Sequence, residues 1–350
     1  MSIDVAVIGV GNCAKSLLEG IAYYTLDGSA ELGLMSPRIG PYPVSAIRVV
    51  CAFDIDSRKV GHNLNAAAAA EPNRTSTIGE CLPSSVVVQR GPTGDSVIQE
   101  LREYYIRESP APPVDVANAL RTTGAELVVN YLPTGSDEAT YAYAEAALQA
   151  GCGFINCMPT VLARDPEWRR RFQTAGLVLM GDDIKSQCGA TIVNRTLLKL
   201  FTMRGIRVTT ATQVNYGGNA DHFNLHHRAD AKEACKQAAL HSVQTNRDAP
   251  AVARMIYTEQ NYDHKKADIR IEGQIFGGVP VSLQVTLEDE DSPNSGGVVV
   301  DAIRAAKLLT ERGKQHEATA LCSFLMKAPP RQCSDEEALA QFRKILETCM

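Results

Sequence analysis

The sequence lacks the segments by which membrane and secreted proteins are usually recognised. No stretch reaches the roughly 18 consecutive apolar residues that a membrane-spanning helix needs. The N-terminal stretch MSIDVAVIG has no basic region followed by a long apolar run, so we expect no secretory signal. A formal net charge of −5 disfavours nucleic acids and anionic membranes as partners, although a local basic pocket is compatible with it.

The ten cysteines and seven histidines show no metal-binding pattern. No cysteine stands in a CxxC pair or at the Cys/His spacing of a zinc site. His222, His226 and His227 are close in sequence, but adjacent histidines on a helix rarely face one ion, so no metal site is predicted. Several cysteines lie in apolar runs, where a reduced thiol acts as a small hydrophobic side chain. We therefore expect free thiols and a cytoplasmic protein.

The first half of the chain alternates short apolar runs with helical segments. At 350 residues the chain exceeds the size that one hydrophobic core usually serves, so two domains are expected. The apolar runs IDVAVI (3–8), IRVVCAFDID (47–56), SSVVVQRG (84–91), AELVVNYLPTGS (125–136) and GFINCMP (153–159) alternate with helix-like sequence. This alternation predicts an α/β fold with a Rossmann-type, doubly wound parallel sheet over residues 1–186.

After residue 205 the period of the pattern changes from helical to alternating. The stretch RVTTATQVNYGG (207–218) alternates, and residues 267–288 have the pattern of a hairpin. Its inward faces are expected to carry Ile269, Ile271 and Ile275 on the first strand, and Val281, Leu283, Val285 and Leu287 on the second. We predict an antiparallel sheet with one covered face, in an α+β domain inserted at residues 187–294.

Residues 295–350 return to a helical pattern and are expected to rejoin the parallel-sheet domain. Ser295 is a candidate cap for the first helix of this segment, and Gly313 a candidate stop. The predicted organisation is therefore a dinucleotide-binding domain interrupted by one insertion.

The stretch GVGNC (9–13) follows the first strand and opens a helix, as in a dinucleotide-binding turn. Gly9 permits the tight turn, Gly11 lets the backbone approach a pyrophosphate, and Ala14 keeps helix and strand close. The N–H groups at the start of the helix then face the phosphates. We assign Gly9, Gly11, Asn12 and Cys13 to the cofactor site.

Asp54 ends the second strand, where an acidic residue accepts hydrogen bonds from the adenosine ribose. An acid at this position favours NAD, because it would repel the additional phosphate of NADP. The alternative is that Asp54 is a solvated aspartate at a strand end.

Five blocks of sequence, in order, carry a resemblance to a known family. They are GVGNC, GDDIKSQCGATI, NYGGNADHFN, EDSPNSGGVVVDAIRAAK and FLMKAPP. With them the chain resembles myo-inositol-1-phosphate synthases of the bacterial and archaeal type. The resemblance implies a homotetramer in which the sheet of the inserted domain builds the core. It also implies conversion of glucose 6-phosphate to inositol phosphate: oxidation at C5 by NAD, enolate formation at C6, attack on the C1 aldehyde, and reduction of the resulting ketone.

The resemblance also assigns four lysines to the catalytic site. Negative charge builds on an oxygen at each step of this reaction, beside a dianionic phosphate, so fixed cations suit it. The matching residues are Lys232, Lys236, Lys265 and Lys327, of which Lys232 also matches a cofactor contact. We predict Lys265 to be an electrophile and proton carrier, and Lys232 and Lys236 to bind oxyanions and phosphate. A lysine crowded by other cations has a lowered pKa, which would let one of them act as a base.

Further residues match family positions near the nicotinamide, the substrate or a bound cation. The resemblance assigns Asp183, Asp221 and Asp291 to catalysis, and Lys185 matches a family position of the same neighbourhood. The cofactor set is Ser186, Asp221, Asn63 and Tyr143, the last two in less specific blocks. Asn215 and Asn219 are candidates to donate to substrate hydroxyls.

Simpler interpretations of these residues remain open. Lys232 and Lys236 lie outside the apolar face of their predicted helix, which taken alone indicates a solvated face. Lys327 taken alone is an ordinary surface residue, and Asp291 beside Ser-Pro-Asn suits a turn. At the level of function, the segment 225–262 departs from the family pattern, so a related cyclase acting on another sugar phosphate is one alternative. A non-catalytic NAD-binding regulatory protein is the other.

Overall fold

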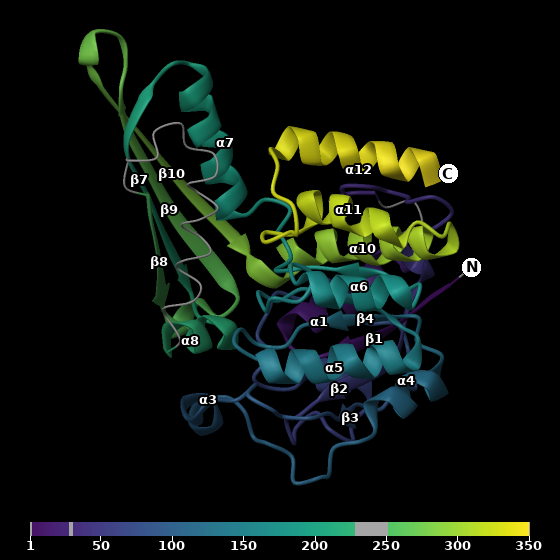
Figure 1. The fold of residues 1–350 in the computed structure, drawn as a ribbon. Helices are drawn as coiled ribbons and strands as arrows, with labels where there is room; N and C mark the ends of the chain where they lie inside the picture. Colours follow the sequence, from purple (N-terminus) through teal and green to yellow (C-terminus); the bar gives the residue numbers. More distant parts are fainter. Residues whose placement is uncertain (1, 28–30, 228–250, 350) are drawn as a thin grey trace.

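Two sheets lie side by side and are joined by a long helix. The computed structural model describes residues 2–27, 31–227 and 251–349. Figure 1 shows the helix-covered parallel sheet on one side, with both chain termini, and the elongated second sheet on the other. The helix α10 (Asp291–Glu311) begins at the end of the second sheet and runs over the first.

The parallel sheet confirms the predicted Rossmann-type fold. Its strands lie in the order β3-β2-β1-β4-β5-β6, and every pairing is parallel. They are β1 (Ile3–Ile8), β2 (Ile47–Asp54), β3 (Gln89–Arg90), β4 (Leu127–Asn130), β5 (Gly153–Asn156) and β6 (Leu179–Met180). All residues of β4 and β5 are buried, as expected for parallel strands covered on both faces.

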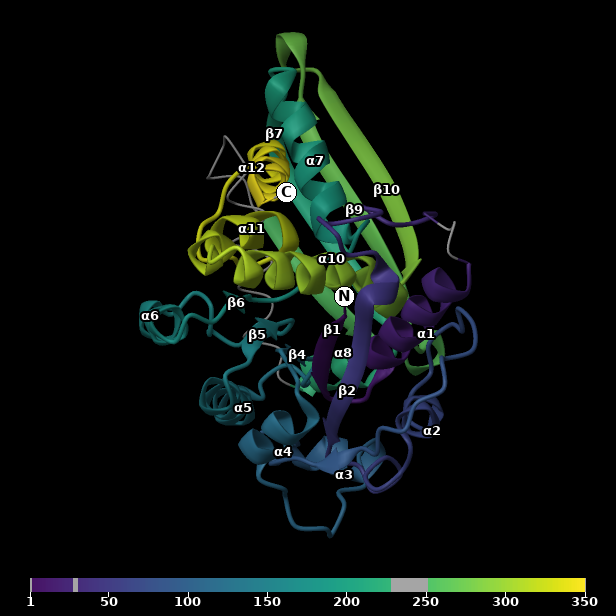
Figure 2. The ribbon, with the colours of Figure 1, turned by 90° about the vertical axis from the view of Figure 1, so that its right-hand side faces the viewer.

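Helices cover both faces of this sheet (Figure 2). One apolar core joins the sheet to α1 (Asn12–Leu26), α2 (Leu64–Ala69), α10 and α11 (Ala318–Leu325), with α12 (Asp335–Cys349) outside α11. A second core on the other face includes α4 (Val116–Thr123), α5 (Asp137–Ala150) and α6 (Pro166–Thr174). The short helix α3 (Gln99–Tyr104) packs against α8 (Ala220–His227).

The second sheet is mixed, which corrects part of the prediction. Its strands, in the order β10-β9-β7-β8, are β7 (Arg207–Gly217), β8 (Ala251–Tyr257), β9 (His264–Gln274) and β10 (Pro280–Glu290). The pairs β9–β10 and β7–β9 are antiparallel as predicted, whereas β7 and β8 are parallel. A parallel pair needs a crossover connection of about a dozen residues or more, and the long segment between β7 and β8 allows one.

One face of this sheet is covered by α7 (Ala190–Met203). Ile269 pairs with Val285, and Ile271 with Leu283, and these side chains pack with α7 in one apolar core. Ile275 was expected on the same face but is 43% exposed, because β9 ends at Gln274 and a short 3-10 helix (Phe276–Gly278) makes the turn. Other 3-10 helices cover Val44–Ala46, Glu259–Asn261 and Gln315–Glu317.

The helix α10 starts earlier than predicted. Ser295 was expected to cap it, but the helix begins at Asp291 and the Ser295 hydroxyl donates to the Ser292 carbonyl inside the first turns (2.9 Å). Pro293 is tolerated there because the first turn of a helix leaves its N–H groups unpaired. Gly313 follows the helix with a φ of +63°, so the predicted stop is confirmed.

The nine cysteines among the described residues are free thiols. In the same part of the chain, no helix has both the length and the apolar character that crossing a membrane requires.

Candidate active site

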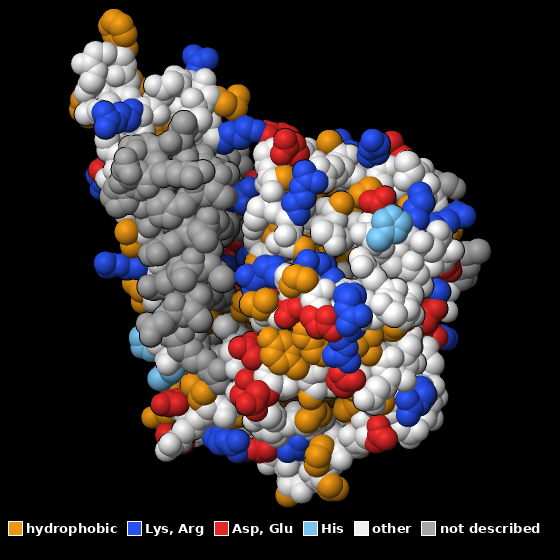
Figure 3. Space-filling model, in the orientation of Figure 1, with side chains coloured by type: hydrophobic (Ala, Val, Ile, Leu, Met, Phe, Trp, Pro, Cys, Tyr) orange, Lys and Arg blue, Asp and Glu red, His pale blue; other side chains and the backbone are white. Residues whose placement is uncertain are grey.

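A cavity of about 330 Å³ lies where the two sheets meet. Its walls include residues that follow β5 and β6, the start of α1, the start of α7 and residues of β7 and β9. This is the carboxyl edge of the parallel sheet, where ligands bind in open α/β folds. On the face shown in Figure 3, Lys and Arg side chains gather along the boundary between the two halves. Nine residues predicted for the site line the cavity: Cys13, Asp183, Lys185, Ser186, Asn215, Asp221, Lys265, Asp291 and Lys327.

The glycine turn has the geometry that a dinucleotide needs. Gly9 has a φ of +84°, and a Cβ at this position would lie 2.8 Å from the Tyr131 carbonyl oxygen, so only glycine fits. Gly11 precedes α1, and a Cβ built on it meets nothing within 4 Å. In the part of the chain that the structure describes, open space therefore lies over the N-terminus of α1, and no side chain caps it. These residues fit a bound pyrophosphate.

Asp54 lies beside this turn, with its carboxylate engaged by backbone N–H groups. One oxygen accepts from Val10 N (2.8 Å), and the other accepts from Ile55 N (2.7 Å) and Asp56 N (2.9 Å). The side chain is only 9% exposed, which contradicts the alternative of a solvated aspartate. Asp54 therefore ties the glycine turn to the end of β2, while its contact with a ribose stays a prediction.

Two lysine–aspartate pairs line the cavity and form what we call the Lys265 cluster. Lys265 Nζ lies 2.7 Å from Asp291 Oδ1, and Lys327 Nζ lies 2.9 Å from Asp183 Oδ1. The two pairs influence each other, because Asp183 helps to raise the pKa of Lys265 and Lys327 helps to lower that of Asp291. Asp291 is thus the first residue of a helix and half of an ion pair, and Lys327 is held by a carboxylate. These contacts do not fit the simpler interpretations, in which Asp291 belongs to a turn and Lys327 is an ordinary surface residue.

The pKa values of the first pair favour the charged forms. Burial opposes the charge on Lys265, but the carboxylate of Asp291 more than offsets it and raises the pKa of the ammonium group. Burial likewise opposes the charge on Asp291, yet Lys265 holds the pKa of this carboxyl well below its usual range. The pair therefore stays ionised over the whole neutral range.

A buried aspartate that sequence reasoning missed fixes the backbone at Asp183. Asp182 is fully buried and accepts hydrogen bonds from Asn156 Nδ2 (2.8 Å) and from the backbone N–H groups of Ala163 (2.9 Å) and Leu162 (3.1 Å). Asp183 itself has a φ of +62°, a conformation that non-glycine residues adopt rarely and that clusters at functional sites. The available signal was the acidic doublet directly after a buried strand.

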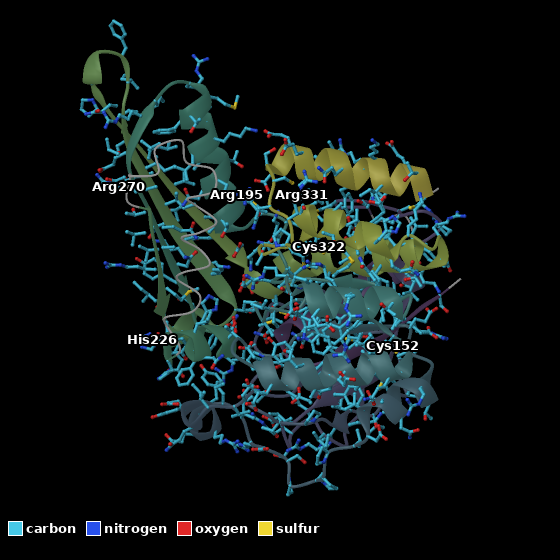
Figure 4. The ribbon with its side chains drawn as sticks, viewed as in Figure 1. Cys152, Arg195, His226, Arg270, Cys322 and Arg331 are labelled. Carbon is cyan, nitrogen blue, oxygen red and sulfur yellow. The ribbon has the colours of Figure 1, made fainter. Side chains whose placement is uncertain are left out.

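A second group of charges, the Arg195 cluster, consists of Lys185, Arg195 and Asp335. Lys185 Nζ lies 3.4 Å from one oxygen of Asp335, and Arg195 Nε lies 3.3 Å from the other. Burial lowers the pKa of Lys185. Arg195 lines the cavity from α7, and Figure 4 places it where this helix faces the segment between α11 and α12. Sequence reasoning missed Arg195, since a lone arginine on an amphipathic helix gives no signal.

The start of α7 lies against the same part of the cavity. Gly189 precedes the helix and offers no side chain to cap it, and Thr191 and Ile192 line the cavity from its first turn. The N–H groups of its first turn and the Arg195 cluster together make a site suited to an anion.

The wall formed by β7 and α8 is polar and held by internal hydrogen bonds. Asn215 is buried and donates to the Arg254 carbonyl (3.1 Å). Asp221 accepts from the backbone N–H of Thr134 (3.2 Å), which joins α8 to the loop after β4. Asn219 does not line the cavity; its amide donates to Asp263 (2.9 Å).

Asn63 and Tyr143, two predicted cofactor residues, do not line the cavity. Asn63 caps α2, where its side chain accepts from Asn65 N (3.0 Å) and donates to the Ser84 carbonyl (2.6 Å). Tyr143 is 2% exposed and packs against Phe53 in the core under Gly91. Lys232 and Lys236 fall within residues 228–250, outside the described residues. Their predicted roles stay predictions.

Comparisons with known proteins agree on one family. The sequence model described as Myo-inositol-1-phosphate synthase matches residues 189–292. The chain is 42% identical to the inositol-3-phosphate synthase of Mycobacterium tuberculosis (strain CDC 1551 / Oshkosh) over 98% of its own length and 95% of that protein. It is 43% identical to the inositol-3-phosphate synthase of Corynebacterium glutamicum over 96% of both chains.

Solved structures share the fold of this chain. The crystal structure of Ari2 superposes with a TM-score of 0.82 at 34% identity, covering 100% of this chain and 99% of Ari2. A myo-inositol-1-phosphate synthase-related protein from Thermotoga maritima superposes with a TM-score of 0.80 at 22% identity, covering 99% of both chains, and shows the same fold.

Proposed function

The chain belongs to the myo-inositol-1-phosphate synthase family, and from this premise we propose how its cavity carries out the reaction. It is an inositol-3-phosphate synthase, which converts glucose 6-phosphate to inositol 3-phosphate. The net reaction is an isomerisation, so the hydride taken from the sugar must be returned to it. The supporting observation is that one cavity joins the start of α1, two lysine–aspartate pairs and the anion site at α7.

NAD would be held by the glycine turn, with its pyrophosphate over Gly11 and the N-terminus of α1. When bound, it supplies the hydride acceptor for the first step and the hydride donor for the last. Cys13 lines the cavity at this point, and burial raises the pKa of its thiol to about 12. The thiol therefore stays protonated at neutral pH, and Cys13 serves as a wall rather than as a nucleophile.

We assign Lys265 to the oxygens that become negative during the reaction. Its raised pKa supports the predicted role as an electrophile and weighs against a role as a base, because the ammonium group stays charged. Lys327 provides a second ammonium group in the same cluster, and its side chain is 34% exposed and thus accessible from the cavity. Two ammonium groups can then donate hydrogen bonds to an enolate.

We assign the phosphate of the substrate to the Arg195 cluster and the start of α7. Two cations and one carboxylate leave this cluster with an excess positive charge, and the helix adds its N–H groups. With the phosphate held there, the carbon chain of the sugar extends toward the Lys265 cluster and the glycine turn. Lys232 and Lys236 keep their predicted roles at oxyanions and phosphate.

The test is to incubate the purified protein with glucose 6-phosphate and NAD⁺ while following inositol phosphate and NADH. Product without accumulation of NADH is expected. One NADH per sugar consumed would instead indicate a simple dehydrogenase, and neither product nor NADH, with NAD still bound, would indicate a regulatory protein. A panel of other hexose phosphates tests the second candidate, a cyclase of altered specificity, which the departures at 225–262 favour.

A homotetramer, a cytoplasmic location and the division into residues 1–186, 187–294 and 295–350 remain proposals. The mass of the protein in solution by light scattering tests the first of them directly.

A further inference from the structure

Asp263, directly before β9, is a buried carboxylate that accepts an unusual number of hydrogen bonds. Its exposure is 2%, and sequence reasoning gave it no role. Its two oxygens accept five hydrogen bonds, from Asn12 Nδ2 (3.1 Å), Asn219 Nδ2 (2.9 Å), Ser292 Oγ (3.0 Å), Ser292 N (3.0 Å) and Thr75 Oγ1 (2.6 Å). A carboxylate offers about four lone-pair sites, so these donors fill it. Asp263 therefore acts through its partners and not on a ligand.

Three of the four donor residues lie at the starts of helices. Asn12 is the first residue of α1, Ser292 is the second residue of α10, and Asn219 directly precedes α8. The fourth donor residue, Thr75, lies in the loop after α2. A helix N-terminus carries partial positive charge, so one anion between three of them stabilises their meeting point.

Each of these helix starts carries a part of the cavity. Cys13, next to Asn12, lies under the glycine turn, and its thiol is 3.7 Å from the Ser292 hydroxyl. Asp291, next to Ser292, holds Lys265, and its backbone N–H donates to the Asp263 carbonyl (3.1 Å). The Asn219 side chain accepts the backbone N–H of His222 (3.0 Å), which fixes the first turn of α8 with Asp221.

We propose that Asp263 is a positioning residue that sets the glycine turn against the Lys265 cluster. The inference rests on the proposed function, in which a hydride leaves C5 of the sugar for the cofactor and later returns. A small displacement between these two parts lets the ketone and the reduced cofactor separate before the return step. For each keto sugar phosphate that escapes, the oxidation of one sugar hydroxyl by NAD⁺ has produced one NADH and one proton, which are also released.

The test is Asp263→Asn, which keeps the shape of the side chain but replaces one acceptor oxygen by an amino group. At least two of the donors then lose their acceptor. We expect kcat for inositol phosphate to fall about 100-fold, as misplacement of reacting groups by about 1 Å does. The Kd for NAD should rise about tenfold, as for loss of a hydrogen bond to a charged group. NADH should accumulate in step with a keto sugar phosphate, and KM for glucose 6-phosphate should change little, because the Arg195 cluster does not contact Asp263.

The matched control is Asp115→Asn, which makes the same exchange at the N-cap of α4. There the side chain accepts the N–H of Asn118 (2.9 Å), and asparagine caps a helix as well as aspartate does. For this control we expect the kcat and the NAD affinity of the wild type, and no release of NADH during turnover. Thr75→Val removes a single hydrogen-bond donor to Asp263, so it should release less NADH than Asp263→Asn. This variant also tests the proposal if Asp263→Asn does not fold.

Three outcomes separate the possibilities. Accumulation of NADH by Asp263→Asn or Thr75→Val, but not by Asp115→Asn, supports the positioning role. The positioning role would be overturned if Asp263→Asn had a lower melting temperature but unchanged kcat, NAD affinity and release of NADH. If Asp263→Asn does not fold, a Thr75→Val variant that releases no NADH would overturn it. If the wild-type protein makes no inositol phosphate, the proposed function fails by itself. The NAD affinity of the three variants then still decides whether Asp263 positions the glycine turn.

Discussion

The two charge clusters of the cavity differ in their balance. The Lys265 cluster has two ammonium groups and two carboxylates, whereas the Arg195 cluster has two cations, one carboxylate and the N-terminus of α7. In the balanced cluster, Asp291 raises the pKa of Lys265, and this ammonium group can donate hydrogen bonds to charge that appears only during the reaction. A cluster with excess positive charge suits a permanent anion. Similar residues thus serve transition-state stabilisation in one cluster and ligand binding in the other.

The largest expected effect comes from breaking the Lys265 cluster. Lys265→Ala should lower kcat at least about 1,000-fold, since it removes a preorganised donor and leaves Asp291 unpaired. The Kd for NAD should stay within a few-fold of wild type. Steady-state assays of inositol phosphate measure the first and fluorescence titration the second.

Lys266→Ala is the control, because Lys266 is the next residue of β9 and its side chain is 40% exposed, 3.5 Å from Asp268. It should keep wild-type turnover. Turnover that persists in Lys265→Ala would show that Lys265 is not the electrophile.

Breaking the Arg195 cluster should act on KM instead of kcat. Arg195→Ala removes one cation from the anion site, so KM for glucose 6-phosphate should rise about 100-fold while kcat at saturation changes little. Lys199→Ala, on the same helix and 38% exposed, is the control. A fall in kcat without a change in KM would place the phosphate elsewhere.

The stability of the protein should depend on pH through the Lys265–Asp291 pair. The folded-state pKa of Asp291 is lowered, so its pairing stabilises the fold above the unfolded pKa of about 4 and is lost as pH falls through the folded value. Asp291→Asn should therefore reduce the free energy of unfolding by about 2 kcal/mol at pH 7. Urea titrations from pH 2 to 8 should show this difference shrink below about pH 4. A difference independent of pH would contradict the ionised pair.

The smallest effect is expected at Lys185, whose amine donates to the Ser323 carbonyl (3.0 Å) as well as lying near Asp335. Lys185→Met keeps the length of the side chain, and Arg195 remains to pair with Asp335. KM for glucose 6-phosphate should rise about threefold to tenfold, as for one lost hydrogen bond to a charged group. An effect as large as that of Arg195→Ala would mean that the two cations contribute equally to binding.

The parallel sheet could be predicted because its buried strands are continuous apolar runs. The glycine turn could also be predicted, because the positive φ at Gly9 requires glycine and so leaves a signal in the sequence. The parallel pairing of β8 with β7 escaped prediction, because alternation in a strand indicates a covered face and not the direction of its neighbour.

The site was predictable only by resemblance. Lys265 and Asp291 are 26 residues apart and Lys327 and Asp183 are 144 apart, so spacing says nothing about their pairing. Asp182 and Asp263 were missed because a buried, fully hydrogen-bonded aspartate looks in sequence like a solvated one. Both lie where several chain segments meet, which only the folded structure reveals.

The central claim is that one cavity takes a hydride from the sugar and returns it to the same molecule. Glucose 6-phosphate deuterated at C5 tests it directly, in the presence of an excess of unlabelled NADH. Mass spectrometry of the product should show deuterium retained in inositol phosphate at every turnover. Loss of the label to the NADH in solution would contradict the account.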